Sequence, residues 1–406
     1  MSLRSPHTLA VLALLSAPAQ AQFLNRALWL GDEREPFRRD YAQDVEYFVD
    51  RYGIVDAPPW WSSGSPLADR IAIAAGSVTS RELTVETAAA LSHDLGSGFR
   101  ARLDYLQSEH QTTRFERLAF GLERHIGERV ALFAQIEGTA DKSRADLSLG
   151  VQLAAGEHSL HRLGLTVVDF AAGQSETFDY AERPYGLLAA GQVGAADSLR
   201  FAYELGLQLP FEERDELDGT ALELWRAIGR VEASVPLTER DALVLGLSGE
   251  RTSKSIAPFA GGTVTAEDGG IELARVTAEW WRRGAQGREY ALGAWFLALD
   301  EGYTPTSAPD LAEDTRRREL MLTARARLPI EGAWSVEPYA VGGRVDLDRV
   351  DPGLPDGAQR ELGFQGRAGV PLRYDFSGRA WLRIDFSMQL DQVAFGGAAV
   401  QLVASL

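Results

Sequence analysis

Long stretches in which apolar and polar residues strictly alternate dominate this chain from about residue 68 onward. In two clear examples, 199–209 and 380–390, every second side chain is apolar along the whole stretch. A period of two predicts β-strands with one apolar and one polar face. Soluble strands are usually about half this length, whereas a tilted strand needs about 9–11 residues to cross a bilayer. The pattern therefore predicts strands that span a membrane.

A sheet in lipid cannot leave an edge unpaired, so these strands are expected to close on themselves. Their polar faces carry charges of both signs beside glycine, which suits a watery interior. Short turns alternate with longer connections along the chain, as periplasmic turns and extracellular loops do in such barrels. The sequence thus predicts an all-β fold: a transmembrane antiparallel up-and-down β-barrel over 68–406 with about 18 strands. Sixteen strands are possible if the weakly patterned hairpin at 69–91 lies outside the barrel.

The first 21 residues are expected to be a signal peptide rather than part of the fold. Arg4 and His7 precede an apolar stretch at 9–15, and a small-residue cleavage pattern follows at 19–21. The apolar stretch is too short to span about 30 Å of hydrocarbon.

Residues 22–67 are predicted to form a helix followed by a linker rich in Pro, Trp and Ser. Apolar side chains recur at helical spacing here, at Phe37, Tyr41, Val45, Phe48 and Tyr52. A single helix cannot bury its own apolar stripe. We expect it to dock at the periplasmic mouth of the barrel, with a plug or gate inside the lumen as the alternative.

Charge and composition exclude several kinds of protein. The chain has 41 basic and 58 acidic residues and a formal charge of −17, which argues against nucleic acid as a partner. It has no Cys, so disulfides, thiolate metal sites and a Cys nucleophile are excluded. Much of the acidity is expected in long connections, at 209–218, 301–315 and 346–358.

The polar faces of the predicted strands supply the candidate pore-lining side chains. They are Arg100, Arg102, Arg144, Arg200, Glu204, Arg230, Arg325, Arg327, Arg367, Arg379, Trp381, Arg383 and Asp385. These charges either set the selectivity of a pore or are simply paired so that each is satisfied.

Tryptophan suggests two roles. Trp225, Trp280, Trp281, Trp295 and Trp334 are expected in an interfacial girdle, with the ring half in lipid. Trp381 falls on a polar face and could instead stack on a sugar inside the pore.

No catalytic motif is found, so we predict that the chain is not an enzyme and has no cofactor or metal. His110 with Ser108, in an expected outer loop, leaves a barrel-bound lipid hydrolase as a remote alternative.

The last stretch alternates to the final residue, with apolar side chains at Ala398, Val400, Leu402, Ala404 and Leu406. It resembles the terminal strand of bacterial outer-membrane β-barrel proteins, although Phe is commoner than Leu at the last position. The resemblance covers 68–406, is porin-like, and identifies no specific family.

The resemblance implies an integral protein of a Gram-negative outer membrane, and the strand count places both termini in the periplasm. The implied partners are outer-membrane lipids, lipopolysaccharide, the barrel-assembly machinery, and a polar small solute or a polysaccharide. The leading hypothesis is a channel for a polar solute. Exopolysaccharide export or capsule attachment is the second hypothesis.

Overall fold

The computed structural model describes residues 70–79, 83–109, 114–138, 145–155, 159–167, 178–182, 185–194, 198–215, 219–350, 363–377, 380–391 and 393–405. The predicted signal peptide, helix and linker lie outside these residues, and the domain boundary near residue 68 stays a prediction.

The described residues form one sheet of twenty-one strand segments. The first seven are β1 (Arg70–Thr79), β2 (Leu83–Gly96), β3 (Phe99–Glu109), β4 (Arg114–Ile126), β5 (Val130–Gly138), β6 (Ala145–Ala154) and β7 (Leu160–Val167). The middle eight are β8 (Phe178–Glu182), β9 (Tyr185–Val193), β10 (Arg200–Asp215), β11 (Thr220–Pro236), β12 (Asp241–Pro258), β13 (Glu267–Arg283), β14 (Glu289–Pro305) and β15 (Glu313–Pro329). The last six are β16 (Trp334–Val336), β17 (Tyr339–Val350), β18 (Gly363–Gly369), β19 (Leu372–Ser377), β20 (Ala380–Gln389) and β21 (Ala394–Ser405).

Helical structure in the described part is limited to two short 3₁₀ turns, η3 (Ala285–Gly287) and η4 (Pro309–Leu311). A helix with the length and apolarity needed to cross a bilayer does not occur among these residues.

The sheet closes into a barrel. Each strand pairs antiparallel with its neighbours in chain order, and β21 returns to pair with β1, where Ile73 lies opposite Leu402. Closure leaves the ring without a free edge, as a sheet in lipid requires.

Three strands of the ring are interrupted. β8 and β9 both pair with β10, β16 and β17 both pair with β15, and β18 and β19 both pair with β20. If each interrupted strand is counted once, the ring has eighteen positions. The ring matches the number of about 18 strands predicted from the sequence only if its strands are counted in this way.

The barrel has two unlike ends. Short connections, such as 97–98, 237–240 and 330–333, join strands at one end, which we call the turn end. The loop end carries longer connections, such as 259–266 and 306–312. β1 begins and β21 ends at the turn end.

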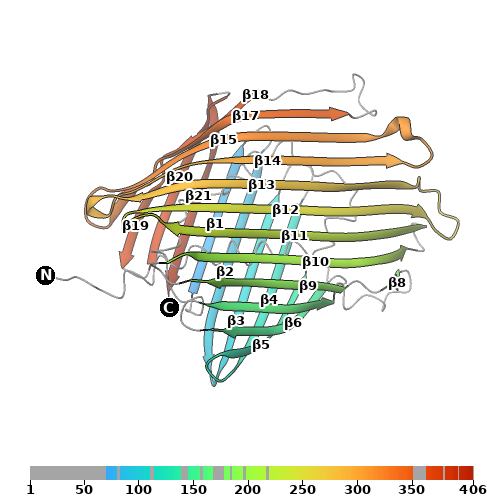
Figure 1. Cartoon of the computed structure of the whole chain (residues 1–406), viewed down its shortest axis with the longest axis horizontal. Coiled ribbons are helices and arrows are strands. Elements are labelled where there is room, and N and C mark those ends of the chain that lie inside the picture. Colours follow the sequence, from blue (N-terminus) through green and yellow to red (C-terminus); the bar gives the residue numbers. More distant parts are fainter. Residues whose placement is uncertain are drawn as a thin grey trace.

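The wall of the barrel is uneven in length. β10 has 16 residues and β12 has 18, whereas β5 has 9 and β7 has 8. Figure 1 shows the long strands β10–β15 side by side along the longest axis, with the blue strands β1 and β2 crossing behind them at a steep angle. The long strands form one side of the wall.

Strands continue into the connections predicted at 209–218, 301–315 and 346–358. β10 runs to Asp215, β14 to Pro305 and β17 to Val350. Acidic side chains on the strand ends pair with arginines on the same or a neighbouring strand, which offsets their charge. The sequence analysis placed these acidic residues in loops, whereas they lie on solvent-exposed ends of strands.

Candidate functional site

Alternation along each strand separates an apolar outer face from a charged inner face. On β15, Leu320 and Leu322 point outward and are 59% and 64% exposed. Glu319 precedes these leucines and Met321 lies between them. Both point to the inner face and are 1% and 0% exposed. The predicted phase of the alternation is confirmed here, and the inner wall is the candidate site.

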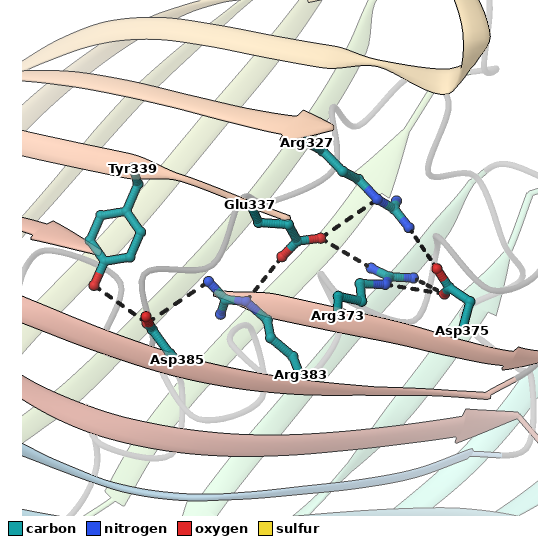
Figure 2. Close-up of polar contacts among 7 residues, drawn as sticks. All are labelled: Arg327, Glu337, Tyr339, Arg373, Asp375, Arg383 and Asp385. Atoms are coloured by element: carbon teal, nitrogen blue, oxygen red, sulfur yellow. Dashed lines mark hydrogen bonds and ion pairs between the residues drawn. The ribbon is translucent and has the colours of Figure 1, made fainter. Parts of the chain in front are cut away.

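Seven polar residues form a connected network on the inner wall near the turn end (Figure 2). They come from four neighbouring parts of the ring: Arg327 on β15, Glu337 and Tyr339 where β16 passes into β17, Arg373 and Asp375 on β19, and Arg383 and Asp385 on β20. We call this set the turn-end network.

Glu337 lies at the centre of the turn-end network and is 3% exposed. Its Oε2 is 3.0 Å from Nε of Arg383, and its Oε1 is 3.5 Å from Nε of Arg327 and 3.8 Å from Nη1 of Arg373. One carboxylate therefore faces three guanidinium groups.

Two further carboxylates offset the remaining positive charge. Asp375 lies 2.6 Å from Nη2 of Arg373 and 3.2 Å from Nη2 of Arg327. Asp385 lies 4.0 Å from Nη2 of Arg383 and accepts a 3.3 Å hydrogen bond from Tyr339. Three arginines and three acids make the turn-end network neutral, provided that all are ionised.

A second cluster lies nearby on β13 and β15. Arg325 holds Glu279 with two charge-assisted hydrogen bonds of 2.9 and 2.5 Å. Trp281 donates its indole N–H to the same carboxylate at 2.7 Å, and the Arg325 guanidinium lies 5.0 Å from the Trp281 ring centroid. Such bidentate pairs fix both side chains in place.

Charge pairs also occur on other parts of the inner wall. Arg226 lies 2.6 Å from Glu250, and Arg162 lies 3.2 Å from Glu123. Arg162 also covers the ring of Phe133, at 4.3 Å from its centroid. The inner wall is thus lined by paired charges on several sides.

An apolar patch interrupts this polar lining on β13–β17. Its buried members are Ile271, Trp295, Leu297, Leu299, Met321, Val341 and Val345. We call it the inner apolar patch. It was not predicted, because the sequence analysis assigned apolar side chains of the strands to the outer face, and these seven face inward.

The predicted pore-lining residues fall into three groups. Arg325, Arg327, Arg367, Trp381, Arg383 and Asp385 come together near the turn-end network. Arg100, Arg102 and Arg200 lie on the inner faces of β3 and β10. The side chains of Arg144, Glu204, Arg230 and Arg379 lie outside the described part of the structure.

Glu337, Tyr339 and Asp375 were missed by the sequence analysis. Glu337 precedes Pro338 at the break between β16 and β17, where alternation gives no phase. Asp375 lies near the end of β19, two residues before Ser377. A carboxylate beside a strand-breaking proline was the available signal for Glu337.

The tryptophan predictions were partly wrong. Trp281 and Trp295 were expected at the lipid interface but are 1% and 4% exposed on the inner wall. Their indole N–H groups explain this position, since each donates to an inner carboxylate, Glu279 or Glu319. Trp334 is outward and 43% exposed. Trp381 is on the inner wall as predicted, with Arg373 stacked 4.5 Å from its ring centroid.

Metal binding has little support in the described residues, among which no group of three or more His, Asp or Glu side chains could hold an ion. His161 instead bonds to Ser159 and Tyr203. His110, which suggested a hydrolase, lies outside the described residues.

A closed antiparallel sheet with an apolar outer face and a charged interior defines a β-barrel of the bacterial outer-membrane type. No family model matches the chain, and no curated protein matches it.

Several solved structures are similar to it in arrangement. OprD from Pseudomonas aeruginosa has 12% identity and a TM-score of 0.41, with 83% of this chain and 92% of that chain covered. OmpTdeltaL8, a loop deletion mutant of an outer membrane protein of Vibrio cholerae, has 9% identity and a TM-score of 0.40, covering 83% and 98%. OccK2 from Pseudomonas aeruginosa, solved with glucuronate, has 13% identity and a TM-score of 0.36, covering 84% and 98%. Because these TM-scores are below 0.5, the assignment to a barrel rests on the strand pairing of this chain.

Proposed function

We propose that this protein is a porin-like channel that passes a polar solute across the outer membrane of a Gram-negative bacterium. The observation that carries the proposal is the closed ring of strands, whose outward side chains are apolar and whose inward side chains are charged. The turn end then faces the periplasm, as short turns do in such barrels.

The outer face supports a position in lipid. Large apolar side chains are exposed on strands all around the ring, including Leu149 at 50%, Leu205 at 48%, Leu322 at 64% and Phe386 at 61%. A continuous apolar surface of this extent is costly in water, at about 25 cal/mol for each Å².

The inner wall supports passage of a polar solute. Paired arginines and carboxylates satisfy one another and make the interior of the barrel polar, which suits a polar solute better than an apolar one. The turn-end network is the densest of these clusters, so we propose that it contributes to the selectivity of the channel.

Planar-bilayer recording tests the channel. The full chain, purified in detergent, should give discrete conductance steps in KCl, and the same sample denatured by boiling in SDS should give none. A protein that dissolves without detergent, or that inserts without conducting, would contradict the proposal.

We also propose partners that follow from a position in the outer membrane. Lipopolysaccharide, outer-membrane lipids and the barrel-assembly machinery are the partners that such a location requires, and co-purification from outer membranes would check them.

A further inference from the structure

Arg317 is a fully buried cation on the inner wall that lacks partners for part of its guanidinium group. It lies on β15, is 0% exposed, and forms an ion pair through Nε with Glu319. Within the described structure, its Nη1 and Nη2 atoms have no hydrogen-bond partner. Two charged donor atoms therefore remain unused in a buried position.

Glu319 is held in place from its other side. Its Oε2 accepts a 3.3 Å hydrogen bond from the indole Nε1 of Trp295, and Arg275 lies 5.1 Å from the Trp295 ring centroid. Because both carboxylate oxygens are in use, Glu319 fixes the orientation of Arg317 without satisfying its two terminal nitrogens.

Apolar side chains border Arg317 on both sides. The strand register places Leu299 of β14 and Leu347 of β17 directly opposite it, and both are at most 3% exposed. Leu297 and Val345 hold the same positions beside Glu319 and are 0% exposed. The guanidinium group thus lies within the inner apolar patch and its extension to Leu347.

Leaving a buried charged donor unpaired is costly, and native structures usually provide a partner for it. Two terminal nitrogens of one guanidinium match the two oxygens of a carboxylate. The leucines and valine on either side match a hydrocarbon body rather than a hydrated ion.

We propose that Arg317 and the surrounding inner apolar patch bind a small organic carboxylate with an apolar body. The proposal rests on the proposed function, because it takes the lumen as the path of the solute. Arg317 is fully buried in this conformation, so binding requires side chains of the inner wall to move aside.

Calorimetric titration of the full chain in detergent tests the site, with benzoate as the probe. We expect saturable binding of benzoate, and weaker binding of both acetate, which lacks the apolar body, and benzyl alcohol, which lacks the charge. Arg317→Met should weaken benzoate binding about tenfold or more, because a charge-assisted pair contributes about 1.5–3 kcal/mol.

Arg318→Met is the matched control. Arg318 is the next residue on β15 but points outward, where it pairs with Asp300 at 2.8 Å. This variant should bind benzoate like the unmodified protein. Leu299→Ala keeps the charge and should weaken benzoate while leaving acetate unchanged. It also tests the site if Arg317→Met fails to fold, as judged by its mobility in unheated SDS gels.

The proposal is overturned if benzoate gives no saturable heat, if Arg317→Met binds it as tightly as the unmodified protein, or if acetate binds equally well. Equal binding of acetate would indicate a plain anion site. Conductance in KCl, recorded on the same samples, separates the two claims: conductance without benzoate binding rejects this site alone, and binding without conductance rejects the channel alone.

Discussion

Glu337 carries the negative charge on which three arginines of the turn-end network depend. Glu337→Gln keeps the shape of the side chain but leaves Arg327, Arg373 and Arg383 facing a neutral amide. Removing one partner of a buried ion-pair network costs about 3–5 kcal/mol, so we expect the free energy of unfolding in urea to fall by that order. The lumen also gains a net positive charge, so the reversal potential in a KCl gradient should shift toward anion preference.

Glu331→Gln is the control for this change, because Glu331 is exposed in the turn between β15 and β16. It removes the same charge and should alter neither quantity measurably. If Glu337→Gln left the reversal potential unchanged, the turn-end network would not face the path of the ions.

Gly369 gives a second test at the scale of one residue, because the ring of Tyr339 lies across it. A Cβ atom added at Gly369 would lie 2.4 Å from Cε1 of Tyr339, so Gly369→Ala must displace the ring. That movement would break the 3.3 Å bond from Tyr339 to Asp385. We expect a loss of about 1–3 kcal/mol in unfolding free energy, as for other overpacked sites.

Two comparisons isolate the contact between Gly369 and Tyr339. Gly121→Ala should cost little, because the nearest atom to its added Cβ would be 3.7 Å away. In a Tyr339→Ala background, Gly369→Ala should also cost little. An equal loss with and without the ring would place the strain elsewhere.

The inner-wall residues that could be predicted are those in regular strands. Arg367, Arg383 and Asp385 lie in stretches where alternation fixes the face of each side chain, and the structure places all three inward. Glu337 could not be predicted from alternation, because its position depends on a break in a strand. Trp295 was wrongly placed at the lipid interface, because its residue type was given more weight than the weak local alternation of apolar and polar residues.

At the scale of the element, β10 reverses its two faces partway along. Leu205 points outward, but the register shifts between Gln208 and Phe211, and Phe211 is buried at 2% exposed. Pro210 lies in this bulge, where the missing backbone N–H removes a ladder hydrogen bond. Strict alternation would instead have put Phe211 outward and Glu212 inward.

Cysteine labelling tests this bulge, since the chain has no Cys and each introduced thiol is unique. With a charged maleimide added to the folded protein, Glu212→Cys should react readily and Phe211→Cys should react more slowly. Labelling after SDS denaturation gives the total thiol in each sample. The reverse order of reactivity would mean that β10 alternates without a bulge.

Strand existence could be predicted from the sequence, but strand length could not. Acidic residues such as Glu212, Asp300 and Asp346 are typical of loops, yet they continue the strands because arginines pair with them. Arg214 lies 2.6 Å from Glu212, and Arg344 lies 2.7 Å from Asp346. Arg318, which pairs with Asp300 at 2.8 Å, lies 18 residues away on the next strand, and a partner at that distance in the sequence is not visible in a local pattern.

At the scale of the whole molecule, these lengthened strands imply that one side of the barrel rises above the membrane. β15 has 17 residues, and at about 3.3 Å per residue and a tilt of about 40° such a strand covers roughly 43 Å, against an apolar band of about 25 Å. Its outward residues change from Leu320 to the charged Arg318 and Arg316 toward the loop end. On β12 and β13 the outward pair of Arg251 and Glu272, 3.0 Å apart, lies toward the same end.

A charge introduced within the apolar band and a charge removed above the band should therefore change the stability of the barrel by unequal amounts. Leu322→Arg puts a charge in the apolar band and should cost about 2–4 kcal/mol in unfolding free energy from lipid vesicles, because an arginine near the bilayer centre loses its hydration. Arg318→Gln, on the same face of β15 and four residues away, removes a solvated ion pair and should cost at most about 1 kcal/mol. Equal costs for the two variants would mean that Arg318 also lies in lipid, and the long strands would then have to tilt steeply enough to fit within the bilayer.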